Sequence, residues 1–127
     1  MSTGHVRFRG SFAAERLDFP LGPLTFDLGF TATKVVGMIY TLATATTVQL
    51  IGGVSPQFSD ITTVRTLGVH KPDYALLIGY QGQDITTQRE TVNANGSVWH
   101  LGVSLTNVAL RNESGSTATF LLVIEGT

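Results

Sequence analysis

The spacing of hydrophobic residues constrains the fold of this chain more than any other feature of its sequence. β-branched and aromatic residues occur in short runs that turn-forming residues separate, whereas apolar residues at helical spacing are nearly absent. Residues 13–17 could form one helical turn, but Pro20, Gly22 and Pro23 end it at once. The pattern predicts an all-β fold. The expected strands are Val6–Phe12, Leu24–Phe30, Lys34–Thr41, Thr46–Ile51, Ile61–Leu67, Tyr74–Tyr80, Thr86–Val92, Val98–Leu105, Asn107–Asn112 and Thr117–Glu125.

Short connections join these strands. Gly52-Gly53, Gln81-Gly82 and Asn95-Gly96 are turn signals, and residues 113–116 are expected to close a hairpin between the last two strands. About eight to ten short strands at this spacing are typical of an antiparallel β-sandwich or barrel. The length of 127 residues suits one such domain. The prolines near residue 20 suggest an N-terminal arm or edge strand, residues 1–23, followed by a β-sandwich domain, residues 24–127.

Three of the expected strands are hydrophobic on both faces. They cover residues 35–40, 75–80 and 120–124. One face of such a strand packs inside a sandwich, whereas the other needs a loop, a sheet edge or another subunit to cover it. A neighbouring subunit is the simplest cover for so many residues. We therefore expect a homo-oligomer whose contacts each bury on the order of 1,000 Å² and include Ile39, Leu77 and Leu122.

Few residues of the chain are charged. Charged residues make up 13% of the sequence, and the formal net charge is −1. Such a surface costs little to desolvate, which favours contact with another protein. One basic group stands out: Arg7, Arg9 and Arg16 near the N-terminus. Arg7 and Arg9 fall on the same face of an expected strand. That face is either the charged outer side of an edge strand or part of an arm that binds an acidic partner surface.

The same composition excludes several classes of partner. The charge pattern lacks the basic footprint of a nucleic-acid-binding protein. No stretch approaches the roughly 18 uninterrupted apolar residues of a membrane helix, and the N-terminal residues do not resemble a secretory signal. We therefore expect neither a nucleic acid nor a membrane as partner. Cysteine is absent, which excludes disulfides and thiolate sites and is compatible with a reducing compartment.

No motif in the sequence carries recognisable catalytic or metal-binding chemistry. The histidines, at positions 5, 70 and 100, lack metal-ligand spacing, and no serine stands in a nucleophile motif. His100 is expected to be a hydrogen-bonded structural residue. The acidic residues occur singly, although two of them could still meet across a cleft as a glycosidase pair does. We expect no enzyme, catalytic residue, metal, cofactor or small-molecule substrate.

The aromatic residues offer a second functional class. Trp99 and Tyr80 could form a stacking platform for a sugar ring, as in carbohydrate-binding β-sandwiches. The alternative for Trp99, the single tryptophan of the chain, is a place in the hydrophobic core. Exposure of Trp99 in a shallow groove would favour the carbohydrate- or receptor-binding class.

The closing segment Leu110–Gly126 reads Leu-Arg-Asn-Glu-Ser-Gly-Ser-Thr-Ala-Thr-Phe-Leu-Leu-Val-Ile-Glu-Gly. Together with the Thr- and Gly-rich β pattern of Lys34–Gly126, the absence of cysteine and the low charge, it resembles the small auxiliary virion proteins of tailed bacteriophages. These include capsid decoration or cement proteins and small β domains of tails and fibres. The similarity lies in the general pattern and identifies no functional residue.

This resemblance implies a jelly-roll-like sandwich and self-association around a three-fold axis, hence a homotrimer. It implies a virion protein, made in the host cytoplasm, that clamps neighbouring capsid subunits or caps a vertex and so stabilises the particle. The partner would be the major capsid protein or another virion protein, with the hydrophobic second faces at the centre of the contact and the three arginines at its rim or on the capsid. The alternative is a receptor- or carbohydrate-binding domain of a phage fibre or tail tip.

Overall fold

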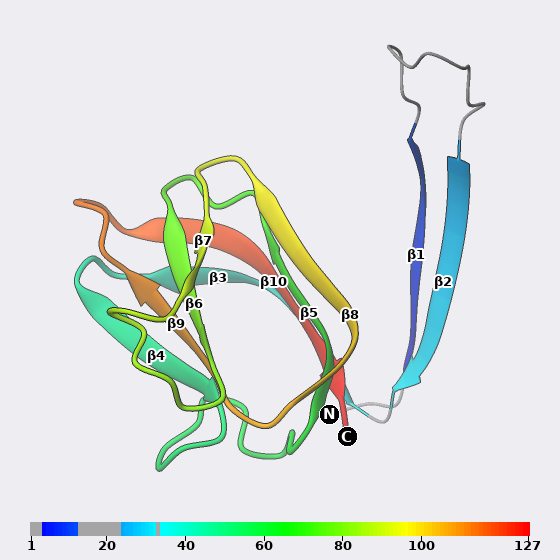
Figure 1. Cartoon of the computed structure of the whole chain (residues 1–127), viewed down its shortest axis with the longest axis horizontal. Helices are drawn as coiled ribbons and strands as arrows, with labels where there is room; N and C mark the ends of the chain where they lie inside the picture. The colour runs from blue at the N-terminus through cyan, green and yellow to red at the C-terminus, as the bar shows by residue number, and fades with distance from the viewer. Residues whose placement is uncertain (1–3, 13–23, 33) are drawn as a thin grey trace.

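The computed structural model in Figure 1 describes the backbone of residues 4–12, 24–32 and 34–127, and the side chains from Lys34 onward. Every regular element in these ranges is a β-strand, which confirms the all-β prediction. The described residues contain no helix with the length and hydropathy to cross a membrane. The strands are β1 (Gly4–Phe12), β2 (Leu24–Ala32), β3 (Lys34–Leu42), β4 (Thr46–Ile51), β5 (Val64–His70), β6 (Leu76–Tyr80), β7 (Glu90–Val92), β8 (Ser97–Leu105), β9 (Val108–Asn112) and β10 (Ala118–Gly126).

Eight of these strands form two antiparallel four-stranded sheets, which confirms the predicted sandwich. The first sheet has the order β3-β10-β5-β8, and the second has the order β4-β9-β6-β7. The two sheets form facing layers in Figure 1. The pairing is nested, because β3 pairs with β10, β4 with β9, β5 with β8 and β6 with β7. Successive nested pairs therefore alternate between the two sheets.

The last two strands do not form the hairpin that the sequence predicts. β9 pairs with β4 and β6 in the second sheet, whereas β10 pairs with β3 and β5 in the first. Both strands have a buried apolar side, and placing them in opposite sheets lets these sides face one another across the core. Asn112 organises the crossing: its side-chain oxygen accepts hydrogen bonds from Ser114, and its amide donates to the carbonyl oxygens of Leu42 and Ser116.

The N-terminal strands form a separate two-stranded sheet. β1 and β2 pair in antiparallel register from Gly4 opposite Ala32 to Phe12 opposite Leu24. The strand from Leu24, which we expected to begin the sandwich, thus belongs to a hairpin, and the sandwich strands begin at Lys34. Figure 1 shows this β1–β2 hairpin projecting from the body near the start of β3. Pairing with a strand close in sequence costs little loop-closure entropy.

The core lies between the two sheets and follows the period of two that strands impose. In β10, Phe120, Leu122 and Ile124 are at most 2% exposed, while Leu121 and Val123 on the opposite side are half-buried. Residues of this size each contribute roughly 1.5–3 kcal/mol when fully buried. The inner sides of β5, β6 and β9 complete the core with Leu67, Val69, Leu76, Ile78, Val108 and Leu110.

Two of the predicted strands begin later than expected because turns occupy their first residues. The backbone N–H and the hydroxyl of Thr86 donate to the Asp84 carboxylate at 2.9 and 2.7 Å, and the N–H of Gln88 donates to the Asp84 carbonyl at 2.7 Å. The chain therefore turns over residues 84–88, and β7 starts only at Glu90. Similarly, Ile61 donates its N–H to the carbonyl of Phe58, and β5 starts at Val64.

Candidate interaction surface

The outer side of the first sheet, away from the core, is the main candidate surface. The strand register arranges its residues in three rows across β3, β10, β5 and β8. Hydrophobic residues and glycine fill most of the positions. We call these twelve positions the outer face: Ile39, Leu121, His70 and Ser97 in the first row, Gly37, Val123, Gly68 and Trp99 in the second, and Val35, Glu125, Thr66 and Leu101 in the third.

Much of this outer face is accessible and uncharged. Ile39 is 66% exposed and Trp99 is 36% exposed, and Leu121 and Val123 are half-buried between them. The single carboxylate, Glu125, is buried and accepts a hydrogen bond of 2.7 Å from the Thr66 hydroxyl. A contiguous apolar sheet surface of this kind is typical of a contact site.

Trp99 is fixed on this face by Gly68. A methyl carbon at Gly68 would lie 2.2 Å from Cζ3 and 2.3 Å from Cε3 of the indole, so the ring lies directly over the glycine backbone. The His70 ring is 5.9 Å away, and its Nδ1 lies 2.6 Å from the Ser97 hydroxyl. The sequence left two alternatives for Trp99, a core position and a surface platform. In the structure Trp99 lies at the surface.

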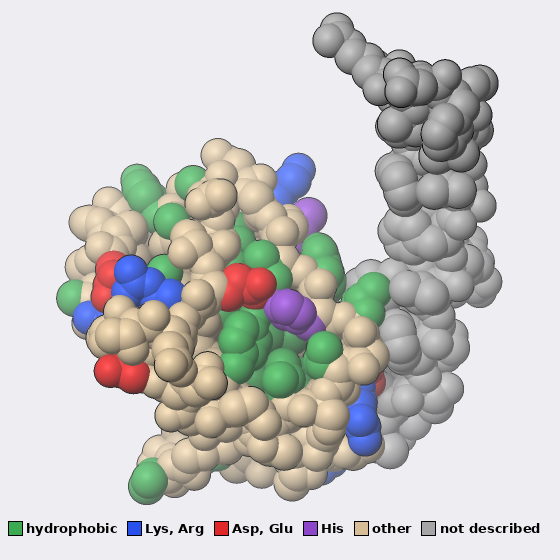
Figure 2. Space-filling view, in the orientation of Figure 1, with side chains coloured by type: hydrophobic (Ala, Val, Ile, Leu, Met, Phe, Trp, Pro, Cys, Tyr) green, Lys and Arg blue, Asp and Glu red, His purple; other side chains and the backbone are tan. Residues whose placement is uncertain are grey.

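Tyr80 belongs to a different cluster, with Glu90 and His100, which joins the second sheet to the first. The Tyr80 hydroxyl donates to Glu90 Oε1 at 2.5 Å and lies 2.9 Å from His100 Nε2, and His100 Nε2 is 2.8 Å from the same carboxylate oxygen. The two rings meet edge to face at 5.5 Å. Figure 2 shows an acidic side chain and a histidine together beside hydrophobic side chains on the visible face. His100 is hydrogen-bonded, as expected, and Tyr80 forms no joint platform with Trp99.

The electrostatics of this cluster keep both oxygen groups in their ordinary protonation states. Burial, then the hydrogen bond to Glu90 and its negative charge, raise the pKa of Tyr80. Burial acts to raise the pKa of Glu90, but hydrogen bonds from Tyr80 and His100 and the charge of His100 outweigh it, so the pKa of Glu90 is lowered from its ordinary value. Tyr80 therefore remains a hydrogen-bond donor and Glu90 an ionised acceptor at neutral pH.

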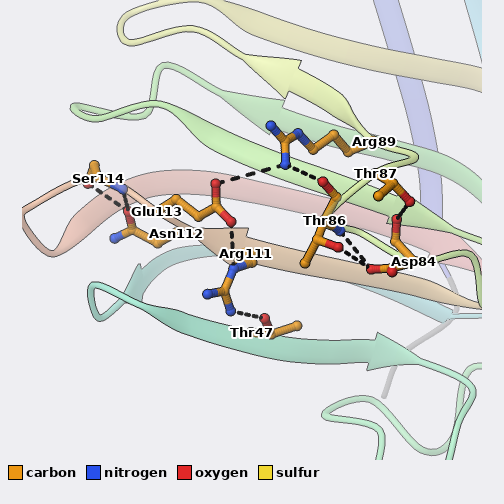
Figure 3. A network of polar contacts seen from close by, with 9 residues as sticks. All are labelled: Thr47, Asp84, Thr86, Thr87, Arg89, Arg111, Asn112, Glu113 and Ser114. Atoms are coloured by element: carbon orange, nitrogen blue, oxygen red, sulfur yellow. Dashed lines mark hydrogen bonds and ion pairs between the residues drawn. The ribbon is translucent and has the colours of Figure 1, made fainter.

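The outer side of the second sheet is polar and covered by its own chain. Figure 3 shows Arg111 donating to Glu113 at 3.0 Å and to the Thr47 hydroxyl at 2.8 Å. Arg89 donates to the Thr86 carbonyl at 2.8 Å and lies 3.9 Å from Glu113. The segment between β6 and β7 packs onto the same sheet, since a methyl carbon at Gly79 would lie 3.2 Å from Ile85.

The predicted interface residues separate into three groups. Ile39 is exposed, as a contact residue requires. Leu77, at 8% exposed, and Leu122, at 0%, are buried by their own chain and offer no contact surface, so their assignment to an interface is corrected. Leu122 lies on the inner side of the first sheet, and Leu77 lies on the second sheet. Arg7 and Arg9 stand opposite Gly29 and Asp27 in the β1–β2 hairpin, and Arg16 lies outside the described residues.

Sequence reasoning missed Gly68 and Glu90. A glycine inside a strand is a known sign of close approach by another group, so Gly68 carried a signal. Glu90 carried none, because its partners come from β6 and β8 and meet it only in the folded chain.

Within the ranges that the structure describes, no group of three or more histidine, aspartate or glutamate side chains is placed to hold a metal ion, and no pocket opens. Comparison of the chain with protein-family models, with curated proteins and with solved structures finds no match.

Proposed function

We propose that this protein is a structural assembly protein that acts through protein–protein contacts and associates with copies of itself through the outer face of the first sheet. The observation that carries the proposal is the 66% exposure of Ile39 beside the half-buried Leu121, on an outer face that holds no Lys or Arg and whose one carboxyl group is buried. Covering Ile39 and its neighbours removes apolar surface from water, which stabilises the contact by about 25 cal/mol per Å². The cost of desolvating polar groups on this face is small.

We further propose that the body is a jelly roll and that the protein decorates a viral particle as a trimer, in contact with the major capsid protein. The nested strand order supports the jelly roll, because an eight-stranded double-sheet roll pairs its first strand with its last and continues inward. This architecture occurs in viral capsid and lectin domains. The resemblance of Lys34–Gly126 to auxiliary virion proteins supports the viral role.

Light scattering coupled to size exclusion tests the self-association directly. We expect the wild-type protein to elute as an oligomer, and Ile39→Lys to shift it to the monomer mass. Val54→Lys is the matched control, since Val54 is 100% exposed and lies outside both sheets, so this variant should keep the wild-type mass. A wild-type chain that remains monomeric up to millimolar concentration would contradict the proposal.

A carbohydrate- or receptor-binding function is the second candidate, and the position of Trp99 favours it. The indole lies against Gly68 and is 36% exposed, so part of an aromatic ring is accessible for stacking on a sugar. Titration with a panel of sugars, followed by the fluorescence of this single tryptophan, tests it. A saturable change in emission, together with loss of sugar binding by Trp99→Phe in isothermal titration calorimetry, would support sugar binding. Unchanged emission with every sugar would contradict it.

A further inference from the structure

The register of the β1–β2 hairpin gathers hydrophobic residues at alternate positions of both strands. Val6 stands opposite Phe30, Phe8 opposite Leu28, Gly10 opposite Phe26 and Phe12 opposite Leu24. Residues directly opposite in an antiparallel pair share a face, and successive residues alternate between faces. One face of the hairpin therefore holds seven large hydrophobic residues. The positions on the other face are polar or glycine: His5, Arg7, Arg9, Ser11, Thr25, Asp27, Gly29 and Thr31.

A hairpin of this kind needs a cover for its hydrophobic face. Two strands alone are marginally stable in water and require a third strand or packing against another element. In the register of β1 and β2 the hydrophobic residues belong to one face of a single layer. The hairpin consequently requires a flat apolar surface of similar length.

The connection to the sandwich restricts where that surface can be. Thr33 alone separates the end of β2, at Ala32, from the start of β3, at Lys34. Two stacked sheets lie about 10 Å apart, whereas the chain from Ala32 to Lys34 spans at most about 7 Å. At this junction β2 therefore cannot lie flat over β3 of its own sheet. A second copy of the chain carries no such restriction.

We infer that the β1–β2 hairpin of one copy packs its hydrophobic face on the outer face of the first sheet of a second copy. The inference rests on the proposed self-association and specifies the two surfaces that form it. Both surfaces are apolar faces of antiparallel β layers. Arg7, Arg9 and Asp27 then belong to the face of the hairpin away from the contact.

The size of the contact agrees with that of a stable interface. If each of the seven hydrophobic residues on this face contributes about 100 Å², the hairpin supplies about 700 Å², near the roughly 800 Å² per partner of a standard interface. On the other side, Ile39 and Trp99 supply the most exposed area, and Leu121 and Val123 lie between them. If each copy both gives and receives a hairpin, a closed ring or dimer contains one such contact per chain.

Cross-linking between differently marked copies tests this exchange, because the native chain contains no cysteine. Phe8→Cys in a tagged chain and Ile39→Cys in an untagged chain are mixed, unfolded and refolded together, and treated with a short bis-maleimide. We expect a tagged–untagged cross-link at least about five times more abundant than the one from Ser11→Cys, which lies on the polar face of the same strand. Equal yields of the tagged–untagged cross-link from Phe8→Cys and from Ser11→Cys would overturn the inference.

A second variant separates this inference from the proposed function. Phe8→Asp introduces a charge on the hydrophobic face and should weaken association at least about a hundredfold, whereas the control Thr25→Asp, on the polar face, should leave it unchanged. If Phe8→Asp remains oligomeric while Ile39→Lys dissociates, the hairpin inference fails and the proposed self-association stands. If the wild-type chain is monomeric, both fail. Circular dichroism checks that each variant retains its β structure.

Discussion

The contact between Gly68 and Trp99 allows a quantitative prediction for Gly68→Ala. The added methyl carbon would lie 2.2, 2.3 and 2.8 Å from three ring atoms of Trp99, whereas ordinary contacts begin at 3.4 Å. The methyl group is attached directly to the sheet backbone and cannot move aside. The indole, which is 36% exposed, must therefore rise from the sheet by roughly 1 Å or more.

The free-energy change follows from two opposing effects. Lifting the ring exposes on the order of 80 Å² of apolar surface, which costs about 2 kcal/mol. Replacing a strand glycine by alanine reduces the entropy of the unfolded chain and returns about 0.5–1 kcal/mol. We expect Gly68→Ala to lower the free energy of unfolding by about 1 kcal/mol.

Gly37→Ala is a matched control, because Gly37 lies in the same row of the outer face and a methyl group there meets nothing within 4 Å. It should be neutral or raise the free energy of unfolding by about 0.5 kcal/mol. Urea denaturation measures both variants. The emission of Trp99, the single tryptophan, should shift to the red and become more sensitive to acrylamide in Gly68→Ala alone. Equal stability of the two variants, with unchanged emission, would refute the reasoning.

Three further predictions concern the interior. Tyr80→Phe removes the donor to the partly exposed Glu90 and should cost about 1 kcal/mol at pH 7 in urea unfolding. Because folding lowers the pKa of Glu90, this stabilisation is lost as the pH falls through the folded pKa, so the stabilities of the variant and the wild type should converge at acidic pH. Asn112→Ala removes four hydrogen bonds at a fully buried residue, and a loss of about 2–3 kcal/mol is expected by the same assay. Leu122→Ala should cost about 2–5 kcal/mol and its outward neighbour Leu121→Ala less than about 1 kcal/mol in thermal unfolding; equal losses would contradict the assigned faces.

Local sequence pattern predicted the strands well, because the period of two and the turn residues are properties of short segments. The strand from Thr46 to Ile51 has the predicted bounds, and all ten expected strands are present in the described ranges. The local sequence pattern did not predict how the strands pair. Residues 107–125 have the pattern of a hairpin, but β9 and β10 enter different sheets because their buried sides gain more by facing each other across the core.

The candidate surface was predictable only in part, for the same reason. The sequence indicated that residues 35–40 and 120–124 have two apolar faces, and Ile39 is exposed as expected. The sequence could not indicate which of these strands has its second apolar face covered by other residues of the same chain. Leu77 is 8% exposed, and Ile85 in the segment after β6 packs over Gly79, two residues further along the same face of the strand. Covering of this kind depends on tertiary packing and leaves no local signature.

The contrast between the two outer sides decides which of them can serve as a contact at low energetic cost. On the second sheet, covering Arg89, Arg111 and Glu113 would remove water from three charged groups, and such desolvation costs several kcal/mol per ion. Their mutual attraction offsets little of this cost while they are exposed, since surface ion pairs contribute about 0–1 kcal/mol. On the first sheet, Glu125 is already buried and hydrogen-bonded in the folded chain. Binding a partner there therefore adds no desolvation cost for this residue. Association through the first sheet therefore buries the apolar surface of Ile39 and Trp99 with little desolvation of charged groups. The polar outer side of the second sheet remains in water.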